Sequence, residues 1–114
     1  MIYLGCAFSS CNNLKEVIIP NGITSINTHT FLGCVSLESI VIPQSVTSIG
    51  LEAFGSYTEV SMIYYMGSAS DWSAIEILRY NENLSNANLY FYTEAQPIQN
   101  GYYWHYIDGV PTPW

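Results

Sequence analysis

The three cysteines carry the most reactive side chains in this 114-residue sequence. Cys11 and Cys34 are 23 residues apart in matching surroundings, and Cys6 precedes that match. We interpret Cys11 and Cys34 as small buried hydrophobic residues, with a bridge between them as the alternative, and Cys6 as a free thiol. No cysteine pair has the close Cys-x-x-Cys spacing of a zinc site, and the two histidines do not complete a ligand set. We therefore expect no bound metal.

The other residues that could act as nucleophiles, acids or bases lack suitable partners. His29 could serve as a base for Cys34, but a buried thiol without a cationic neighbour is a poor nucleophile. His105 lies between two aromatic residues, which indicates either a packing role or a hydrogen-bonded cap residue. The repeated pairs Thr24-Ser25 and Thr47-Ser48 indicate a hydroxyl ladder, and no acidic residues are matched for acid–base catalysis. The sequence thus predicts no catalytic residue, no cofactor and no enzymatic activity.

The charge balance narrows the range of partners. Only Lys15 and Arg79 are basic, against nine acidic residues, for a net charge of -7. Binding to nucleic acid or to an anionic membrane surface needs clustered basic residues, so we expect neither. No apolar run reaches the roughly 20 residues that span a bilayer, and no secretion signal opens the chain. With 49% hydrophobic residues, the chain is predicted to fold as one domain.

A repeat with a period of 23 residues must position these side chains. The positions that recur are Phe8, Phe31 and Phe54; Cys11 and Cys34; Leu14 and Leu37; Pro20 and Pro43; Ile26 and Ile49. Agreement at many positions over one fixed period is typical of a solenoid, in which each repeat forms one coil.

Each repeat predicts the same series of short elements. The Phe, Cys and Leu positions recur every three residues, as on a helical or 3₁₀ turn. The β-branched runs 17–19 and 40–42 then indicate strands, which Pro20 and Pro43 end. A second extended piece follows at 23–26 and at 46–49. Stacked coils would pair these strands into parallel sheets, with coils about 4.8 Å apart.

These residues resemble the BspA-type leucine-rich repeat. The pattern Ala-Phe-x-x-Cys-x-x-Leu-x-x-Ile-x-Ile-Pro-x-x-Val-Thr-Ser-Ile-Gly is matched over residues 7 to 52. The resemblance implies an α/β-type solenoid, a right-handed leucine-rich-repeat coil with short parallel strands and 3₁₀ or short helical turns. It departs from better-known leucine-rich repeats in lacking the buried asparagine after the strand, so we expect no asparagine ladder. It further implies a non-catalytic, adhesin-like bacterial surface protein.

Two regions are predicted, 1–66 with the coils and 67–114 as a β-rich aromatic cap. In the third coil we expect Val60, Ile63 and Trp72 to take the places of Leu37, Ile40 and Ile49. The cap should contain a short helix at 68–75, a loop at 78–87, a strand at 88–92 and a terminal hairpin turning at Asp108-Gly109. Terminal repeats are expected to differ because they shield the open end of the stack.

The first coil is expected to be truncated. Tyr3 precedes Phe8 by the same interval that separates Ile26 from Phe31. Because this would leave an uncapped N-terminal repeat face, we expect a homodimer to form through it. The chain is expected at the cell surface or secreted, as part of a longer precursor.

The predicted partner-binding residues are Ile18, Val41, Tyr64, Trp104 and Trp114. The first three should form an apolar stripe on the face of the sheet opposite the core, either covered by the rest of the coil, which we favour, or open to a partner. From the resemblance, the partner is a protein, such as a host extracellular-matrix protein or another surface protein. The alternatives are a carbohydrate-binding aromatic cap and a purely architectural cap of a longer solenoid.

Overall fold

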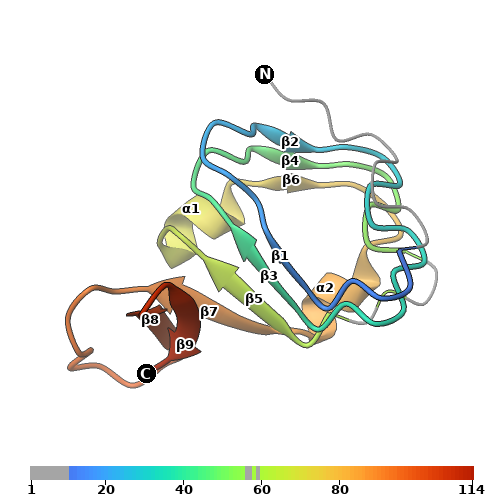
Figure 1. The fold of residues 1–114 in the computed structure, drawn as a ribbon. Helices are drawn as coiled ribbons and strands as arrows, with labels where there is room; N and C mark the ends of the chain where they lie inside the picture. The colour runs from blue at the N-terminus through green and yellow to red at the C-terminus, as the bar shows by residue number, and fades with distance from the viewer. Residues whose placement is uncertain (1–10, 56–57, 59) are drawn as a thin grey trace.

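The computed structural model describes residues 11–55, 58 and 60–114. Expectations that involve Tyr3, Cys6 and Phe8 lie outside these residues. Two sheets wrap around one core, with turn segments closing each coil between them (Figure 1). The large sheet has the order β1 (Glu16–Ile18), β3 (Ser39–Ile42), β5 (Met62–Tyr65), β7 (Asn88–Tyr92), β8 (Tyr103–Ile107) and β9 (Val110–Pro113). The small sheet has the order β2 (Ser25–Ile26), β4 (Ser48–Ile49) and β6 (Glu76–Ile77).

The 23-residue period sets the register of the first coils. In the large sheet Val17 lies opposite Ile40, and Ile40 lies opposite Ile63, in parallel pairing. In the small sheet Ile26 lies opposite Ile49. The strands end just before the two prolines, whose nitrogen cannot donate to a ladder. The predicted coils of short parallel strands are therefore confirmed.

The repeated side chains form columns along the stack. The rings of Phe31 and Phe54 are stacked with centroids 5.2 Å apart, and both side chains are fully buried. The hydroxyls of Ser25 and Ser48 are 2.7 Å apart on the small sheet, which confirms the predicted hydroxyl ladder. Buried aliphatic residues from both sheets fill the space between them. Stacking thus converts a sequence period into a continuous core.

The third coil differs from its predicted alignment. Ile49 pairs with Ile77 of β6, so the expectation that Trp72 takes its place is wrong. Trp72 instead lies in the short helix α1 (Ala69–Ser73), which follows β5 and lengthens this coil. The hydroxyl of Ser68 accepts a hydrogen bond from the Asp71 N–H, and the Asp71 carboxylate accepts one from the Ser68 N–H. This reciprocal capping box confirms the predicted N-terminus of the helix.

The polar segment 78–87 is not the expected loop. It contains helix α2 (Glu82–Asn86), with Leu84 buried in the core. Asn81, just before the helix, is buried and accepts a hydrogen bond from Phe54 N–H while donating to the carbonyls of Gly50 and Leu78. Its amide links the third coil to the fourth. A buried asparagine therefore satisfies backbone groups at this position, although the repeat pattern itself lacks the asparagine of better-known leucine-rich repeats.

Strands β7, β8 and β9 complete the large sheet. β7 pairs with β5 in parallel, with Tyr64 opposite Tyr90, as predicted for the 88–92 strand. β8 and β9 form the predicted antiparallel hairpin. Asp108 and Gly109 both have positive φ, of 49° and 79°, which suits a tight hairpin turn. Both sheets therefore continue beyond residue 66.

Candidate partner-binding surface

The outer face of the large sheet carries the predicted apolar stripe. Ile18, Val41, Tyr64 and Tyr90 lie at one register position in four neighbouring strands. Their neighbours along each strand point into the core, because side chains alternate along a strand. The stripe is therefore exposed to solvent unless another part of the chain packs against it.

Trp104 of β8 supplies most of that cover. The end of the large sheet curls so that the hairpin lies beside the stack (Figure 1). The Trp104 ring contacts Tyr64, Tyr92 and Tyr106 at centroid distances of 5.2, 5.2 and 5.0 Å. Its indole N–H donates a hydrogen bond of 2.9 Å to the carbonyl oxygen of Tyr65. Val41, Tyr64 and Trp104 form a second, smaller core outside the coil.

This second core limits the predicted binding residues. Val41, Tyr64 and Trp104 are only 2%, 3% and 0% exposed, so they offer no surface to a partner. The preference for burial of the stripe agrees with this, but the covering group is the hairpin rather than the rest of the coil. Ile18 and Trp114 remain 52% and 44% exposed. The candidate site therefore narrows to these two residues and their surroundings.

Tyrosine hydroxyls around the second core remain protonated at neutral pH. Burial raises the pKa of Tyr64, and the charges of Tyr90 and Glu16 raise it further. Burial likewise raises the pKa of Tyr106, with further contributions from Tyr92 and Glu16. Glu16 on β1 is thus near both rings, and a carboxylate borders the apolar surface.

An apolar groove remains open between the outer face and the hairpin. It has a volume of about 210 Å³ and is lined by Ile18, Ile19, Pro20, Asn21, Val41, Pro43, Met66 and Tyr106. We call this surface the hairpin groove. The exposed side chains of Ile107 and Val110 are on the same hairpin but on its other face, because they alternate with Tyr106 and pair with each other.

The sequence interpretation missed Tyr106 as a residue of the groove. A signal was present, because Trp104 and Tyr106 alternate along the predicted strand and the Asp-Gly turn fixes the partner strand. What the sequence did not give was the direction in which the hairpin folds. That direction depends on Trp104 packing against Tyr64, a contact between residues 40 positions apart.

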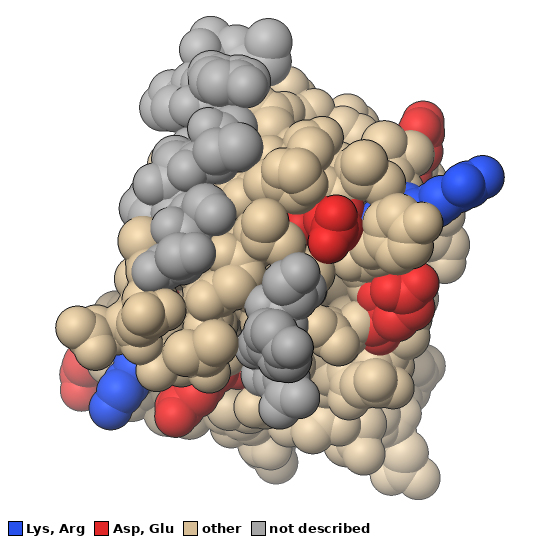
Figure 2. Space-filling model, turned by 90° about the vertical axis from the view of Figure 1, so that its right-hand side faces the viewer, with Lys and Arg blue, Asp and Glu red and all other residues tan. Residues whose placement is uncertain are grey.

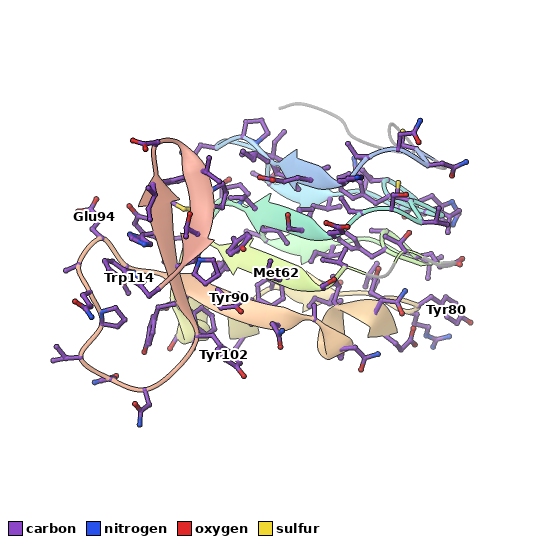
Figure 3. The ribbon with its side chains drawn as sticks, turned by 60° about the horizontal axis from the view of Figure 1, so that its bottom comes forward. Met62, Tyr80, Tyr90, Glu94, Tyr102 and Trp114 are labelled. Carbon is purple, nitrogen blue, oxygen red and sulfur yellow. The ribbon has the colours of Figure 1, made fainter. Side chains whose placement is uncertain are left out.

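A second exposed aromatic group lies at the base of the hairpin. The Trp114 ring stacks on His105 with centroids 3.6 Å apart, and its indole N–H donates to the Thr93 carbonyl. Tyr102 is exposed and packs beside Tyr90. Figure 3 shows Tyr90, Tyr102 and Trp114 toward the hairpin, whereas Tyr80 lies at the opposite end. His105 therefore packs against an aromatic ring, as predicted.

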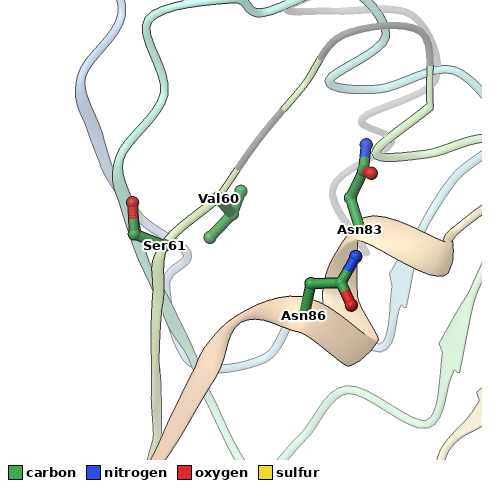
Figure 4. Close-up of a pocket in the computed structure, with 4 residues that line it drawn as sticks. All are labelled: Val60, Ser61, Asn83 and Asn86. Carbon is green, nitrogen blue, oxygen red and sulfur yellow. The ribbon is translucent and has the colours of Figure 1, made fainter.

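Among the described residues, another hollow is lined by uncharged side chains. Val60, Ser61, Asn83 and Asn86 line a pocket of about 260 Å³ (Figure 4). The Asn83 amide donates hydrogen bonds to the carbonyls of Phe54 and Thr58, so it acts as a structural bracket. Within the described part of the chain, no group of three or more His, Cys, Asp or Glu side chains could hold a metal ion.

His29 contacts a carboxylate rather than serving a nucleophile. Its Nε2 lies 3.5 Å from Glu52 Oε1 in the next coil. Cys34 is fully buried and Cys11 is partly exposed, and burial is the main cause that raises the pKa of the Cys34 thiol. A raised pKa disfavours the thiolate, which is the nucleophilic form.

Charged side chains are sparse on the surface. Figure 2 shows a face that is mostly uncharged, with separate acidic and basic groups and no basic patch. Among the residues that the structure describes, no helix is both long and apolar enough to cross a bilayer. A partner would therefore bind the described surface through polar and apolar contacts rather than through a strong electrostatic potential.

Comparison with known proteins gives two matches. The family described as BspA type leucine rich repeat region matches residues 5–100 in six copies. A crystal structure of a leucine rich cell surface protein from Faecalibacterium prausnitzii A2-165 is similar, with 47% sequence identity and a TM-score of 0.59. The match covers 62% of this chain and 19% of that chain, so this chain corresponds to a small part of that protein. Among curated proteins, no relative matches.

Proposed function

Because this chain belongs to the BspA-type leucine-rich repeat family, we propose that it is a non-catalytic segment of a cell-surface protein whose hairpin groove binds a protein partner. The similar protein is described as a leucine rich cell surface protein, which supports the proposed location. An adhesin-like role in the whole protein, and a place for this segment at its C-terminal end, are parts of the same proposal.

The exposed apolar groove is the observation that carries this proposal. Contiguous apolar surface bordered by polar residues is typical of interaction sites. Here Ile18, which is 52% exposed, lines a hollow that Tyr106 also lines. Glu16, two residues before Ile18 on β1, adds negative charge on the same face of the strand. The partner is therefore a protein segment with an apolar anchor flanked by Lys or Arg.

A matched pair of substitutions tests the groove. Ile18→Asp places a charge in it, whereas Val35→Asp places the same charge at another β-branched residue of similar exposure (54% against 52%) before β3. Binding of the 114-residue chain to a panel of immobilised host extracellular-matrix proteins would be measured by interferometry. We expect Ile18→Asp to weaken binding at least tenfold and Val35→Asp to leave it unchanged.

Two outcomes would contradict the groove as the binding site. Equal loss in both variants would mean a nonspecific effect of charge, and full binding by Ile18→Asp would place the contact elsewhere. Circular dichroism of each variant shows that a loss is not caused by unfolding. Absence of binding to every matrix protein in the panel would reject this partner class.

Carbohydrate binding is a second candidate, favoured by the exposed rings of Tyr102 and Trp114. Flat aromatic faces suit sugar rings, but the Trp114 ring has one face against His105. Soluble glycans that quench tryptophan fluorescence, with loss of the effect in Trp114→Ala, would support it. A purely architectural role predicts neither glycan nor protein binding.

The homodimer through the N-terminal repeat face remains a prediction. It is tested by light scattering of the 114-residue chain over a range of concentrations. A mass that rises toward twice 12.8 kDa supports the dimer, and a constant mass of one chain rejects it.

A further inference from the structure

We propose that Cys11 and Cys34 form a thiol–disulfide site, at which oxidation joins two neighbouring coils by a covalent bond. The inference is independent of the hairpin groove, because the cysteines lie on the turn segments that precede β1 and β3. It concerns a modification of the coil stack itself.

The two cysteines occupy the same place in consecutive coils. The carbonyl of Cys11 accepts a hydrogen bond of 3.2 Å from Leu14 N–H, and the carbonyl of Cys34 accepts one of 3.2 Å from Leu37 N–H. Each cysteine therefore begins the same turn. The strands that follow, β1 and β3, pair in parallel with the same offset that separates the cysteines. The backbone register thus holds Cys11 over Cys34.

The two residues are close together in the core. The backbone and the thiol of Cys11 both affect the pKa of the Cys34 thiol, so the two side chains are near each other. Both residues pack against the same core, and neither is in a disulfide. Neighbouring strands are about 4.8 Å apart, within the roughly 4.4–6.8 Å between Cα atoms that a disulfide spans.

The backbone of Cys34 is also held in place. Its N–H donates a hydrogen bond of 3.0 Å to the Thr58 hydroxyl, which in turn donates to the Phe31 carbonyl at 2.6 Å. Cys34 is fully buried, whereas Cys11 is partly exposed. An external oxidant therefore meets Cys11 first, and Cys34 reacts from inside.

A small-molecule disulfide such as oxidised glutathione is the co-reactant. The Cys11 thiolate attacks one glutathione sulfur, the glutathione S–S bond breaks, and one glutathione thiolate leaves. Cys34 then gives up its proton and attacks the Cys11 sulfur, which releases the second glutathione thiolate. The two protons from the cysteines end on the two glutathione thiolates. Two protein thiols are oxidised to one disulfide while one glutathione disulfide is reduced to two thiols.

The bond would stabilise the stack by restricting the unfolded chain. It closes a loop with 22 residues between Cys11 and Cys34. Disulfides of this loop length are stabilising in proteins outside the reducing cytosol. The bond would therefore tighten two neighbouring coils, a role that rests on the proposed location at the cell surface.

The test uses the 114-residue chain with Cys6→Ser, incubated in reduced or oxidised glutathione. We expect oxidation to lower the intact mass by two hydrogens and to raise Tm by roughly 10 °C. Cys11→Ser and Cys34→Ala in the same background should show no such rise. If Cys34→Ala does not fold, the partly exposed Cys11→Ser variant supplies the control.

Several results would overturn the proposal. These are a stable glutathione adduct on Cys11, a disulfide-linked dimer on a non-reducing gel, and two unreacted thiols at equilibrium. A cross-linked monomer whose Tm does not rise would reject the stabilising role. None of these outcomes depends on whether the hairpin groove binds a protein.

Discussion

At the scale of single residues, the coils share an unusual backbone position. His29, Glu52 and Tyr80 have φ of 61°, 51° and 65°, and they follow β2, β4 and β6 in turn. A left-handed conformation costs a non-glycine residue roughly 1–2 kcal/mol. The same bend is thus used three times, each time by a residue other than glycine. The spacing of His29 and Glu52 follows from the repeat. The positive φ of the three residues could not be predicted from the sequence, because none of the three is a glycine or an asparagine.

Replacing Tyr80 by glycine should relieve this strain. Tyr80 is exposed, so Tyr80→Gly loses little packing, and we expect stability to be unchanged or increased by up to about 1 kcal/mol. Tyr102 is similarly exposed and has no positive φ, so Tyr102→Gly should lower stability by about 0.5–1 kcal/mol. Urea unfolding compares the two variants. Equal losses in both would contradict the strain argument.

The capping box of α1 makes stability depend on pH. Hydrogen bonds from Ser68, through its backbone first and its hydroxyl second, hold the pKa of Asp71 below its ordinary value of 3.8. Because this pKa is depressed on folding, the stabilisation is complete above about pH 4 and is lost as pH falls through the lower folded value.

We therefore expect Asp71→Asn to be less stable than the unaltered chain at pH 7. In acid, the difference in stability between the two should become smaller. Ser68→Ala should cost about 0.5–2 kcal/mol at pH 7 through loss of the N-cap. Thermal unfolding at a series of pH values measures both. A difference for Asp71→Asn that persists unchanged at pH 2 would show that its carboxylate charge is not responsible.

At the scale of elements, the strands of the coils could be predicted and the position of the hairpin could not. The β-branched composition and the period predicted the strands that contain Val17, Ile40 and Ile63. The Asp108-Gly109 turn predicted the hairpin. Helix α2 was missed because its sequence, Glu-Asn-Leu-Ser-Asn, has one buried residue and weak helix formers. The cover on Tyr64 was missed because it depends on a tertiary contact with Trp104.

Removing the Trp104 ring should open the outer face. Trp104→Ala is expected to cost about 3–5 kcal/mol, because it leaves a cavity beside Val41 and Tyr64 and removes the indole hydrogen bond to the Tyr65 carbonyl. Trp114→Ala, at a half-exposed residue, should cost less than about 1 kcal/mol. Guanidinium unfolding compares the two, and similar losses would mean that the hairpin does not pack as described.

At the scale of the whole molecule, one sequence period produces two sheets and a shared core. Leu37 is almost fully buried between them, and Phe31 and Phe54 stack in a column. The family, the coils and the parallel register were predictable from residues 7–52, since each feature repeats. The binding surface was not, because three of its five predicted residues form the second core. Right-handed coiling and the 1–66 and 67–114 boundaries stay predictions.

Truncation in the shared core should weaken the entire fold. Leu37→Ala is expected to lower the free energy of unfolding by about 2–5 kcal/mol. Lys15→Ala should have almost no effect, because Lys15 is exposed and only its backbone carbonyl joins the coils. Fluorescence and circular dichroism should report one common transition for Leu37→Ala. Two separate transitions would mean that coils and hairpin unfold independently.

The account rests most heavily on closure of the outer face by the hairpin, which hydrogen exchange of the tryptophan indole N–H groups tests directly. In NMR spectra of the 114-residue chain, the Trp104 signal is expected to exchange slowly and to show contacts to Val41 methyl protons. The half-exposed Trp114 signal should exchange much faster. Rapid exchange of Trp104, with no contact to Val41, would contradict the closed face and return Val41 and Tyr64 to the binding surface.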